Sequence, residues 1–147
     1  MKKIITGICI ATLLSSGLAF AASHADPIAT RKAEMKKVGG AMKTLATMAK
    51  GGMAFDGAAA LAAMETMQGV AGSFKMHFPA GSESGGETTA SPKIWSDAAG
   101  FEAANTKFST DIASAIASAP ADVAGLGAAL GQIGPNCSAC HQAYRVK

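Results

Sequence analysis

Residues 26–50 read DPIATRKAEMKKVGGAMKTLATMAK, and this stretch decides the fold. Asp26 followed by Pro27 is a typical helix start, with the aspartate as N-cap and the proline at the first helical position. Beyond this start, residues at steps of three and four form one helical seam: Ile28, Arg31, Met35, Val38, Met42, Leu45 and Ala49. The pair Gly51-Gly52 ends the pattern, so the stretch predicts a helix with one inward face.

The same periodicity recurs three more times along the chain. A second helix starts after Asp56, a long loop runs over residues 79–92, a third helix ends near Pro120, and a fourth starts around Asp122. The inward positions of these helices are Ala60, Met64, Met67, Ala71, Phe74 and Phe78, then Trp95, Ala98, Phe101, Asn105, Phe108 and Ile112, then Val123, Leu126, Leu130, Ile133 and Cys137. No segment alternates as a strand does. The sequence therefore predicts an all-α protein, an antiparallel four-helix bundle.

The first 21 residues are expected to be a signal peptide. Lys2 and Lys3 precede an apolar stretch over residues 4–20, and Ala19 and Ala21 supply the small residues of a cleavage site. An N-terminal membrane anchor is the alternative, but the apolar stretch is short and contains several polar residues. We expect one mature domain, residues 22–147, exported to a bacterial periplasm without stable membrane insertion.

The composition argues for a cofactor and against nucleic acid as a partner. The whole chain has 13 Lys+Arg against 10 Asp+Glu, a formal net charge of +3, without any basic cluster. In residues 22–147, Val, Ile, Leu and Phe together number 18, with seven Met beside them. So few large side chains usually indicate disorder, but disorder also requires a high net charge. We therefore expect a folded chain whose core is completed by a buried cofactor.

The most specific chemical motif is Cys-Ser-Ala-Cys-His at residues 137–141. Cys137 and Cys140 lie three residues apart, so both thiols face one side of a helix and can bond the two vinyl groups of a single haem, with His141 available to iron. A thioredoxin-like dithiol, a structural zinc site and a plain disulfide are the alternatives. The first needs a βαβ unit, the second needs more ligands, and the third would be strained on a helix.

A four-helix pattern with Cys-x-x-Cys-His near the C-terminus resembles the class II c-type cytochromes, the cytochrome c′ group and its low-spin relatives. Four blocks carry the resemblance: Arg31-x-x-x-Met35, Phe78-Pro79-x-Gly81-Ser82, Pro92-x-Ile94-Trp95, and residues 137–145. The resemblance implies one haem c, attached covalently through Cys137 and Cys140, with His141 as the axial ligand of iron.

The resemblance also implies roles for three residues outside the motif. Met35 occupies the distal position, where low-spin relatives coordinate iron and high-spin members only block the sixth site. Arg31 lies on the inward seam and is expected to meet an anion such as a haem propionate, unless it extends to solvent. Arg145 is expected on the side of the last helix that carries His141, adding positive charge near the imidazole. For each residue, an ordinary core or surface role is the alternative.

Three further features lead to expectations about structure. Gly39-Gly40 inside the first helix should cost stability, which a close approach of a helix or of haem would explain. Pro135 should either kink the last helix or divide it. His77 is expected to be solvated at a helix end, and His24 to lie in a frayed terminus.

The functional expectation is a periplasmic monohaem cytochrome that carries single electrons, with redox proteins as partners. The alternative is a high-spin cytochrome c′ that binds or scavenges nitric oxide or other small gases. The sequence contains neither a Ser-His-Asp set nor a glycine-rich phosphate loop, so we do not expect an enzyme. Relatives in this class are often homodimers through their first two helices, and the small residues here permit such a contact.

Overall fold

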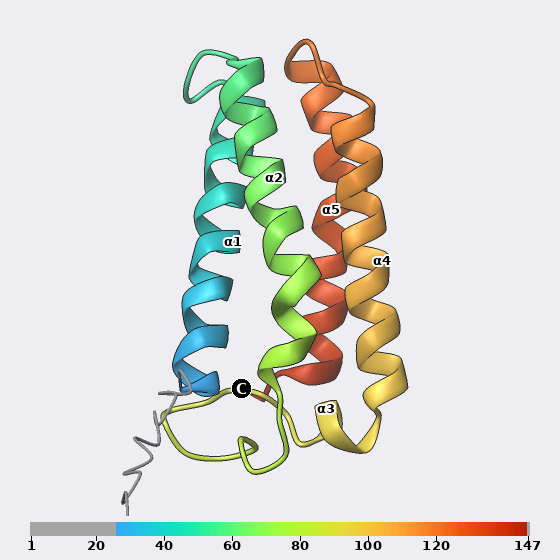
Figure 1. Ribbon diagram of the computed structural model, residues 1–147. Helices are drawn as coiled ribbons and strands as arrows, with labels where there is room; N and C mark the ends of the chain where they lie inside the picture. Colours follow the sequence, from blue (N-terminus) through green and yellow to red (C-terminus); the bar gives the residue numbers. More distant parts are fainter. Residues whose placement is uncertain (1–25, 147) are drawn as a thin grey trace, which may run out of the picture.

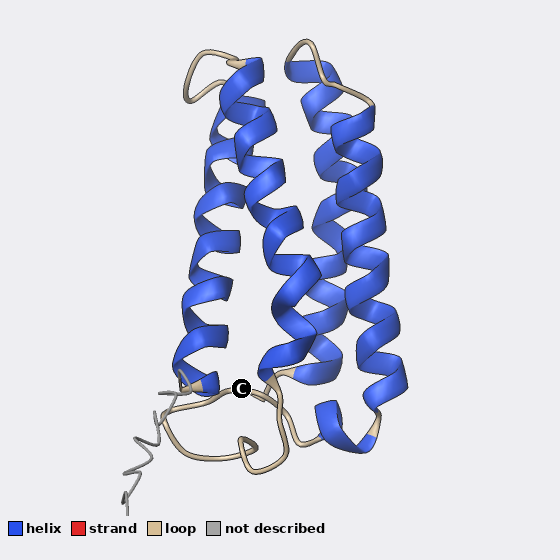
Figure 2. Cartoon of the chain, in the orientation of Figure 1, coloured by secondary structure: helices blue, strands red, loops and turns tan. Residues whose placement is uncertain are grey.

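The helices run alternately up and down along one axis, as Figure 1 shows. The computed structural model describes residues 26–146. Its helices are α1 (Pro27–Ala49), α2 (Gly57–Ser73), the 3₁₀ turn η1 (Phe74–His77), α3 (Lys93–Ser96), α4 (Ala98–Ala117) and α5 (Val123–Tyr144). Figure 2 shows helices and loops, with no strand in this part of the chain. The predicted four-helix bundle is confirmed.

Aspartate caps fix where the long helices begin. The Asp26 carboxylate accepts a hydrogen bond from the Ile28 amide at 2.9 Å, and the Asp56 carboxylate accepts one from the Ala59 amide at 3.0 Å. The Asp122 carboxylate likewise accepts from a backbone amide of the first turn of α5. Each carboxylate satisfies an amide that has no partner inside its helix. All three predicted helix starts are confirmed.

The core has two parts. Helix α1 packs against α2 and α5, and α4 packs against the same two helices. The larger part holds the largest of the fully buried side chains: Leu45, Met48, Met64, Met67, Ile112, Leu126 and Ile133. A smaller cluster of Ile94, Phe101 and Tyr144 lies at the end of the bundle where α5 finishes. None of the helices in residues 26–146 combines the length and apolarity that a membrane crossing requires.

The predicted third helix is wrong in one respect, because a break at Asp97 divides it into α3 and α4. Asp97 leaves the helical conformation, with φ −130° and ψ 54°, and its carboxylate accepts from the Gly100 amide at 3.2 Å. The same carboxylate accepts a hydrogen bond from the Tyr144 hydroxyl at 3.0 Å. Asp97 therefore acts as an N-cap and as a partner for α5, which the helical seam through Trp95 did not reveal.

The second helix also ends earlier than its seam predicts. Helix α2 stops at Ser73, and residues 74–77 continue as the tighter η1 turn. This turn brings the Phe74 and Phe78 rings to 5.1 Å from each other, in an edge-to-face arrangement. The change of helix type therefore places two aromatic rings at the end of the bundle.

Helix α5 passes through Pro135 without dividing. Proline cannot donate to the carbonyl of Gly131, and Gly131 is exposed, so water can satisfy that carbonyl. The next residue, Asn136, is buried, and its side-chain amide donates to the Gln132 carbonyl at 3.1 Å and to the Asp111 carboxylate on α4 at 2.7 Å. The sequence left a kink or a division open, and the structure keeps one helix.

Candidate functional site

A cavity of about 730 Å³ opens between the helices at the end of the bundle that holds Ile94, Phe101 and Tyr144. This volume is in the usual range for a cofactor site. Its apolar lining comes from the four long helices, from η1 and the residue after it, and from the short helix α3: Met35, Val38, Met42, Val70, Ala71, Phe74, Phe78, Ile94, Phe101, Ala104, Phe108 and Tyr144. A large apolar cavity inside a bundle with few bulky residues suits a flat hydrophobic group.

The motif of α5 lines this cavity. Cys137, Cys140 and His141 all contribute to its wall, and both cysteines are free. Burial raises the pKa of the Cys137 thiol, and burial together with the nearby Cys137 raises the pKa of the Cys140 thiol. Both side chains are therefore protonated thiols at neutral pH, held on the side of α5 that faces the apolar space.

The His141 ring is biased toward its neutral form. The residue as a whole is exposed, yet partial burial of the ring lowers its pKa, and the charge of Arg145 lowers the pKa further. A neutral imidazole keeps a free nitrogen lone pair, which is the form that binds iron.

Met35 lines the same cavity from α1, the helix that packs beside α5. Its side chain is partly buried and packs against the main core. The structure therefore brings together four of the predicted site residues, Met35, Cys137, Cys140 and His141, around one apolar space. A thioether in this position can either ligate a metal or fill space.

Gly39 also lines the cavity. Of the two explanations left open for Gly39-Gly40, a close helix approach does not occur within residues 26–146, and a close approach of haem stays a prediction. A Cβ atom added to either glycine would meet no atom within 4 Å. Both residues are exposed, so packing within residues 26–146 does not require glycine at these positions.

Arg31 is buried, with 4% of its surface exposed, so it does not extend to solvent. Its Nη1 atom donates to the Ser82 hydroxyl at 3.0 Å, and its Nη2 atom donates to the Ser82 carbonyl and to the Thr88 hydroxyl, both at 2.7 Å. The guanidinium also lies 4.9 Å from the centre of the Phe78 ring. Arg31 therefore fastens the loop over residues 79–92 to α1.

A propionate contact of Arg31 stays a prediction. Arg31 lines the cavity, and in the described part of the chain its Nε atom has no hydrogen-bond acceptor. The sequence predicted a buried anion as its partner, whereas the structure supplies uncharged oxygens from the loop. Loop residues such as Ser82 and Thr88 carry no helical period, so only the Phe78-Pro79-x-Gly81-Ser82 block pointed to this region.

Replacing Arg31 should loosen the loop. We expect Arg31→Ala to lower the free energy of unfolding by about 3 kcal/mol, because the hydrogen bonds of a buried guanidinium are lost and loop oxygens remain unpaired. Urea unfolding and limited proteolysis within residues 79–92 measure the effect. Arg31→Lys should recover only part of it, and Lys37→Ala, at an exposed position of α1 away from the loop, should have little effect. Equal urea midpoints for Arg31→Ala and the parent would contradict the fastening role.

Arg145 lies at the cavity but outside the helix, because α5 ends at Tyr144. Its backbone is extended and pairs with Ala90, and its Nε atom donates to the Thr89 hydroxyl at 3.1 Å. The expected position on the last helix is therefore wrong. The positive charge of Arg145 still lies close enough to lower the pKa of the His141 ring.

The hydroxyl of Tyr144 is part of the site that the sequence did not reveal. It donates to Asp97, and a Cβ atom at Gly100 would come within 2.5 Å of both this hydroxyl and the Asp97 carboxylate. Glycine is therefore required where α5 meets the start of α4. In the sequence, Tyr144 stood only within the block of residues 137–145, and Gly100 had no sequence signal at all.

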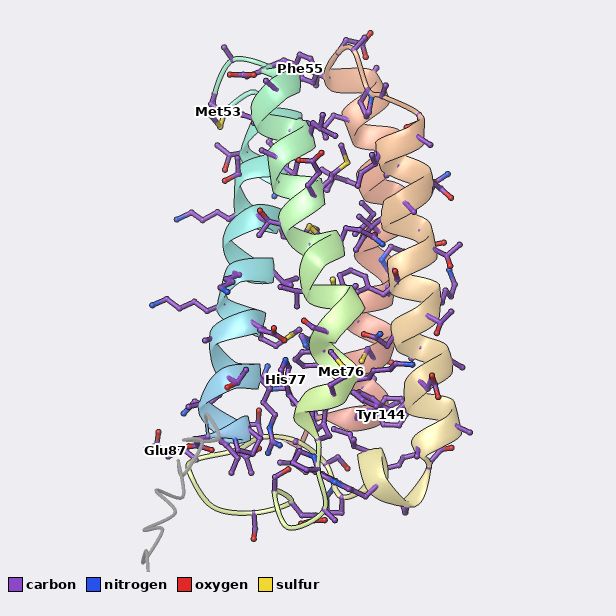
Figure 3. All side chains as sticks on the ribbon, in the orientation of Figure 1. Met53, Phe55, Met76, His77, Glu87 and Tyr144 are labelled. Atoms are coloured by element: carbon purple, nitrogen blue, oxygen red, sulfur yellow. The ribbon has the colours of Figure 1, made fainter. Side chains whose placement is uncertain are left out.

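His77 is not the solvated histidine that the sequence predicted. Its side chain is 24% exposed, and its Nε2 atom lies 3.3 Å from a carboxylate oxygen of Glu34. Figure 3 shows His77 between α1 and the end of α2. The same Glu34 oxygen accepts a hydrogen bond from the Ser73 hydroxyl at 3.0 Å. Glu34 on α1 therefore contacts the end of α2 through Ser73 and the η1 turn through His77, and His77 is absent from the cavity lining.

A four-helix bundle whose end cavity is lined by Cys-x-x-Cys-His defines a class II c-type cytochrome. The chain belongs to the cytochrome c′ family, because the family described as Cytochrome C′ matches residues 26–145. It therefore binds haem c, and the cavity fits this group in size, apolarity and the placement of two thiols and an imidazole.

Similar proteins carry two different names. A cytochrome c-556 from Agrobacterium fabrum is 38% identical over 145 residues, which covers 99% of this chain and 96% of the relative. The solved structure of cytochrome c′ from Rhodopseudomonas palustris is 36% identical with a TM-score of 0.80, covering 84% of this chain and 98% of that one. A nitric oxide complex of a mutant cytochrome c′ from Alcaligenes xylosoxidans is 32% identical with a TM-score of 0.73, covering 82% and 94%.

Proposed function

We propose that this protein is a monohaem electron carrier, with Cys137 and Cys140 holding the haem through thioether bonds and His141 and Met35 binding its iron. When bound, haem c supplies a one-electron couple between ferrous and ferric iron. The observation that carries the proposal is the presence of Met35 in the wall of the cavity that also contains the motif.

The surrounding residues favour electron exchange in a dry site. The pKa of His141 is lowered by partial burial and by Arg145, which favours the neutral imidazole. The thioether of Met35 is a soft ligand that stabilises ferrous iron. Most of the cavity wall is apolar, and burial against such a wall raises the reduction potential of a haem. Arg31 and the loop over residues 79–92 close the end of the cavity. No residue pair in this arrangement resembles an acid–base or nucleophilic catalyst.

Gas binding is the second candidate function. One solved relative is a cytochrome c′ mutant in complex with nitric oxide. In this chain, a Met35 side chain that packs in the cavity without binding iron would leave a sixth position for a diatomic gas. Flexible methionines near the site, Met35 and Met42, can move to admit a small ligand.

We also propose that the protein works in the periplasm. The support is the sequence pattern of residues 1–21, which lie outside the described residues, and the Cys-x-x-Cys-His motif. The two thiols of such a motif react with haem only in reduced form, so attachment must precede their oxidation in that compartment. The expected partners are soluble redox proteins.

The optical spectrum tests the proposed function against the alternative. We expect the reduced holoprotein to show the sharp bands of low-spin haem and to keep them under carbon monoxide, because both axial positions are filled. The same sample should exchange electrons reversibly in a potentiometric titration. A high-spin reduced spectrum that shifts on addition of carbon monoxide would overturn the electron-carrier proposal in favour of gas binding.

A further inference from the structure

The solvent face of α1 carries positive charges only, so the expectation that the chain has no basic cluster is wrong for this face. Within the helix the exposed charged residues are all lysines, and a further lysine follows at its end: Lys32, Lys36, Lys37, Lys43 and Lys50. The single carboxylate within α1 belongs to Glu34, whose side chain is 13% exposed and faces His77 and Ser73. No carboxylate within α1 therefore neutralises the lysines on its solvent face.

Four of these lysines form a line. At roughly 100° per residue, Lys32, Lys36, Lys43 and Lys50 fall within a sector of about 40°, whereas Lys37 points about 100° away from its nearest member. We call these four residues the lysine stripe. In residues 26–146, Lys32 alone of the four has a carboxylate within 4 Å, that of Glu87 at 3.5 Å. Both side chains of that pair are largely exposed, so the pair neutralises the stripe only weakly.

The lysine stripe borders the haem cavity. Lys32, Lys36 and Gly39 all line it, and Arg145 lines it as well. A molecule seated on the stripe would therefore rest against the wall of the cofactor site. Electron exchange between two proteins requires that the redox group of one lies close to the redox group of the other.

Gly39 and Gly40 leave the backbone of α1 without side chains at two positions between Lys36 and Lys43. Each costs about 1 kcal/mol relative to alanine inside a helix, and side chains at both positions would meet empty space. Internal packing of the described chain therefore does not explain Gly40, whereas Gly39 lines the cavity, where bound haem can come close to its backbone. The two glycines lie between Lys36 and Lys43, where they leave bare backbone that another protein can approach.

We propose that the lysine stripe, with Gly39 and Gly40 at its centre, docks an acidic electron-transfer protein whose carboxylates pair with the lysines. The proposal rests on the proposed electron-carrier function. Charge complementarity fixes the partner's chemistry and accelerates encounter. A second copy of this chain fits poorly, because a two-fold contact through the stripe would oppose lysine to lysine. A lipid surface fits poorly too, because the stripe lacks the large apolar side chains that insert into membranes.

Two charge reversals on the same helix test the surface. Lys43→Glu changes the stripe, and Lys37→Glu makes the same change of net charge beside it. Both sites are exposed and neither residue lines the cavity. With holoprotein at low ionic strength and poly-L-glutamate as the acidic probe, calorimetry should show that Lys43→Glu weakens binding at least about threefold more than Lys37→Glu. Equal weakening by the two variants would overturn the proposal.

Electron exchange with small complexes supplies a second readout. Oxidation of the ferrous holoprotein by the hexacyanoferrate(III) anion should slow as ionic strength rises, and Lys43→Glu should slow it more than Lys37→Glu does. Oxidation by a cationic cobalt(III) complex should show the opposite trend. If the oxidation rates of both variants equal that of the parent, the lysine stripe does not lie beside the redox centre.

The outcomes separate this proposal from the proposed function. A parent that binds poly-L-glutamate through the stripe but exchanges electrons with neither complex would overturn the electron-carrier function and support the acidic docking surface. If the parent exchanges electrons but its binding to poly-L-glutamate does not depend on Lys43, the electron-carrier function is supported and the acidic docking surface is overturned. Stripe-dependent binding to phosphatidylglycerol vesicles, stronger than binding to poly-L-glutamate, would overturn the protein partner in favour of a membrane.

Discussion

Covalent haem should be lost completely when Cys137 and Cys140 are both replaced with alanine. Each thiol lines the cavity, and the two lie one helical turn apart on α5, so together they account for both expected thioether bonds. Without them haem can bind only through ligation and apolar contacts, which denaturation removes. The measurement is the peroxidase activity of haem that stays with the polypeptide on a denaturing gel.

Ser138→Ala is the matched control for the double cysteine variant. Ser138 lies inside the motif, but it is exposed and absent from the cavity lining, so this variant should keep the haem band. Each single cysteine variant should keep a weaker band through its remaining thioether. A band of parental intensity in the double variant would show that the haem is attached elsewhere.

The sequence predicted the long helices well because their signals are local. Asp26, Asp56 and Asp122 cap the helices that follow them, and each cap acts within three residues of its position. The break at Asp97 escaped prediction because it depends on a contact across the fold. Its carboxylate holds Tyr144, which lies 47 residues further along the chain. No helical period contains that information.

In the candidate site, too, the residues with local sequence signals could be predicted, and the contacts made across the fold could not. Met35 and the motif residues could be placed because helical spacing fixes which side of a helix they occupy. The partners of Arg31 could not be placed, since Ser82 and Thr88 belong to a loop without a period. An arginine on an inward seam implied a buried partner. The seam alone could not show whether that partner was an anion or a set of uncharged loop oxygens.

Whether Met35 binds iron decides between the two candidate functions. In favour of ligation, Met35 lies on α1 beside α5, in the wall of the cavity that holds His141. Its unbranched side chain is only partly buried, so the sulfur can extend into the cavity without a change in the backbone. The Arg31-x-x-x-Met35 pattern does not settle the matter, because high-spin members of the class also carry it.

Met35→Ala is therefore expected to convert the haem from six-coordinate to five-coordinate. Loss of a thioether that favours ferrous iron should lower the reduction potential by an amount on the order of 100 mV, and carbon monoxide should bind where the parent excludes it. Visible spectra, potentiometry and carbon monoxide titration measure these changes. Met35→Leu should behave in the same way, because leucine keeps most of the volume but cannot coordinate.

Met42→Ala separates ligation from a simple gain of space. Met42 lines the same cavity two turns further along α1 and is also partly buried, so its truncation opens a comparable volume. If Met35 is a ligand, Met42→Ala should keep the low-spin spectrum and exclude carbon monoxide. Both Met35 variants should instead lose the low-spin spectrum and bind carbon monoxide. If the parent is already high-spin, and Met35→Ala and Met42→Ala both merely speed the entry of gas, Met35 is a packing residue. The sixth position would then belong to a diatomic ligand, and gas binding would become the function that this cavity supports.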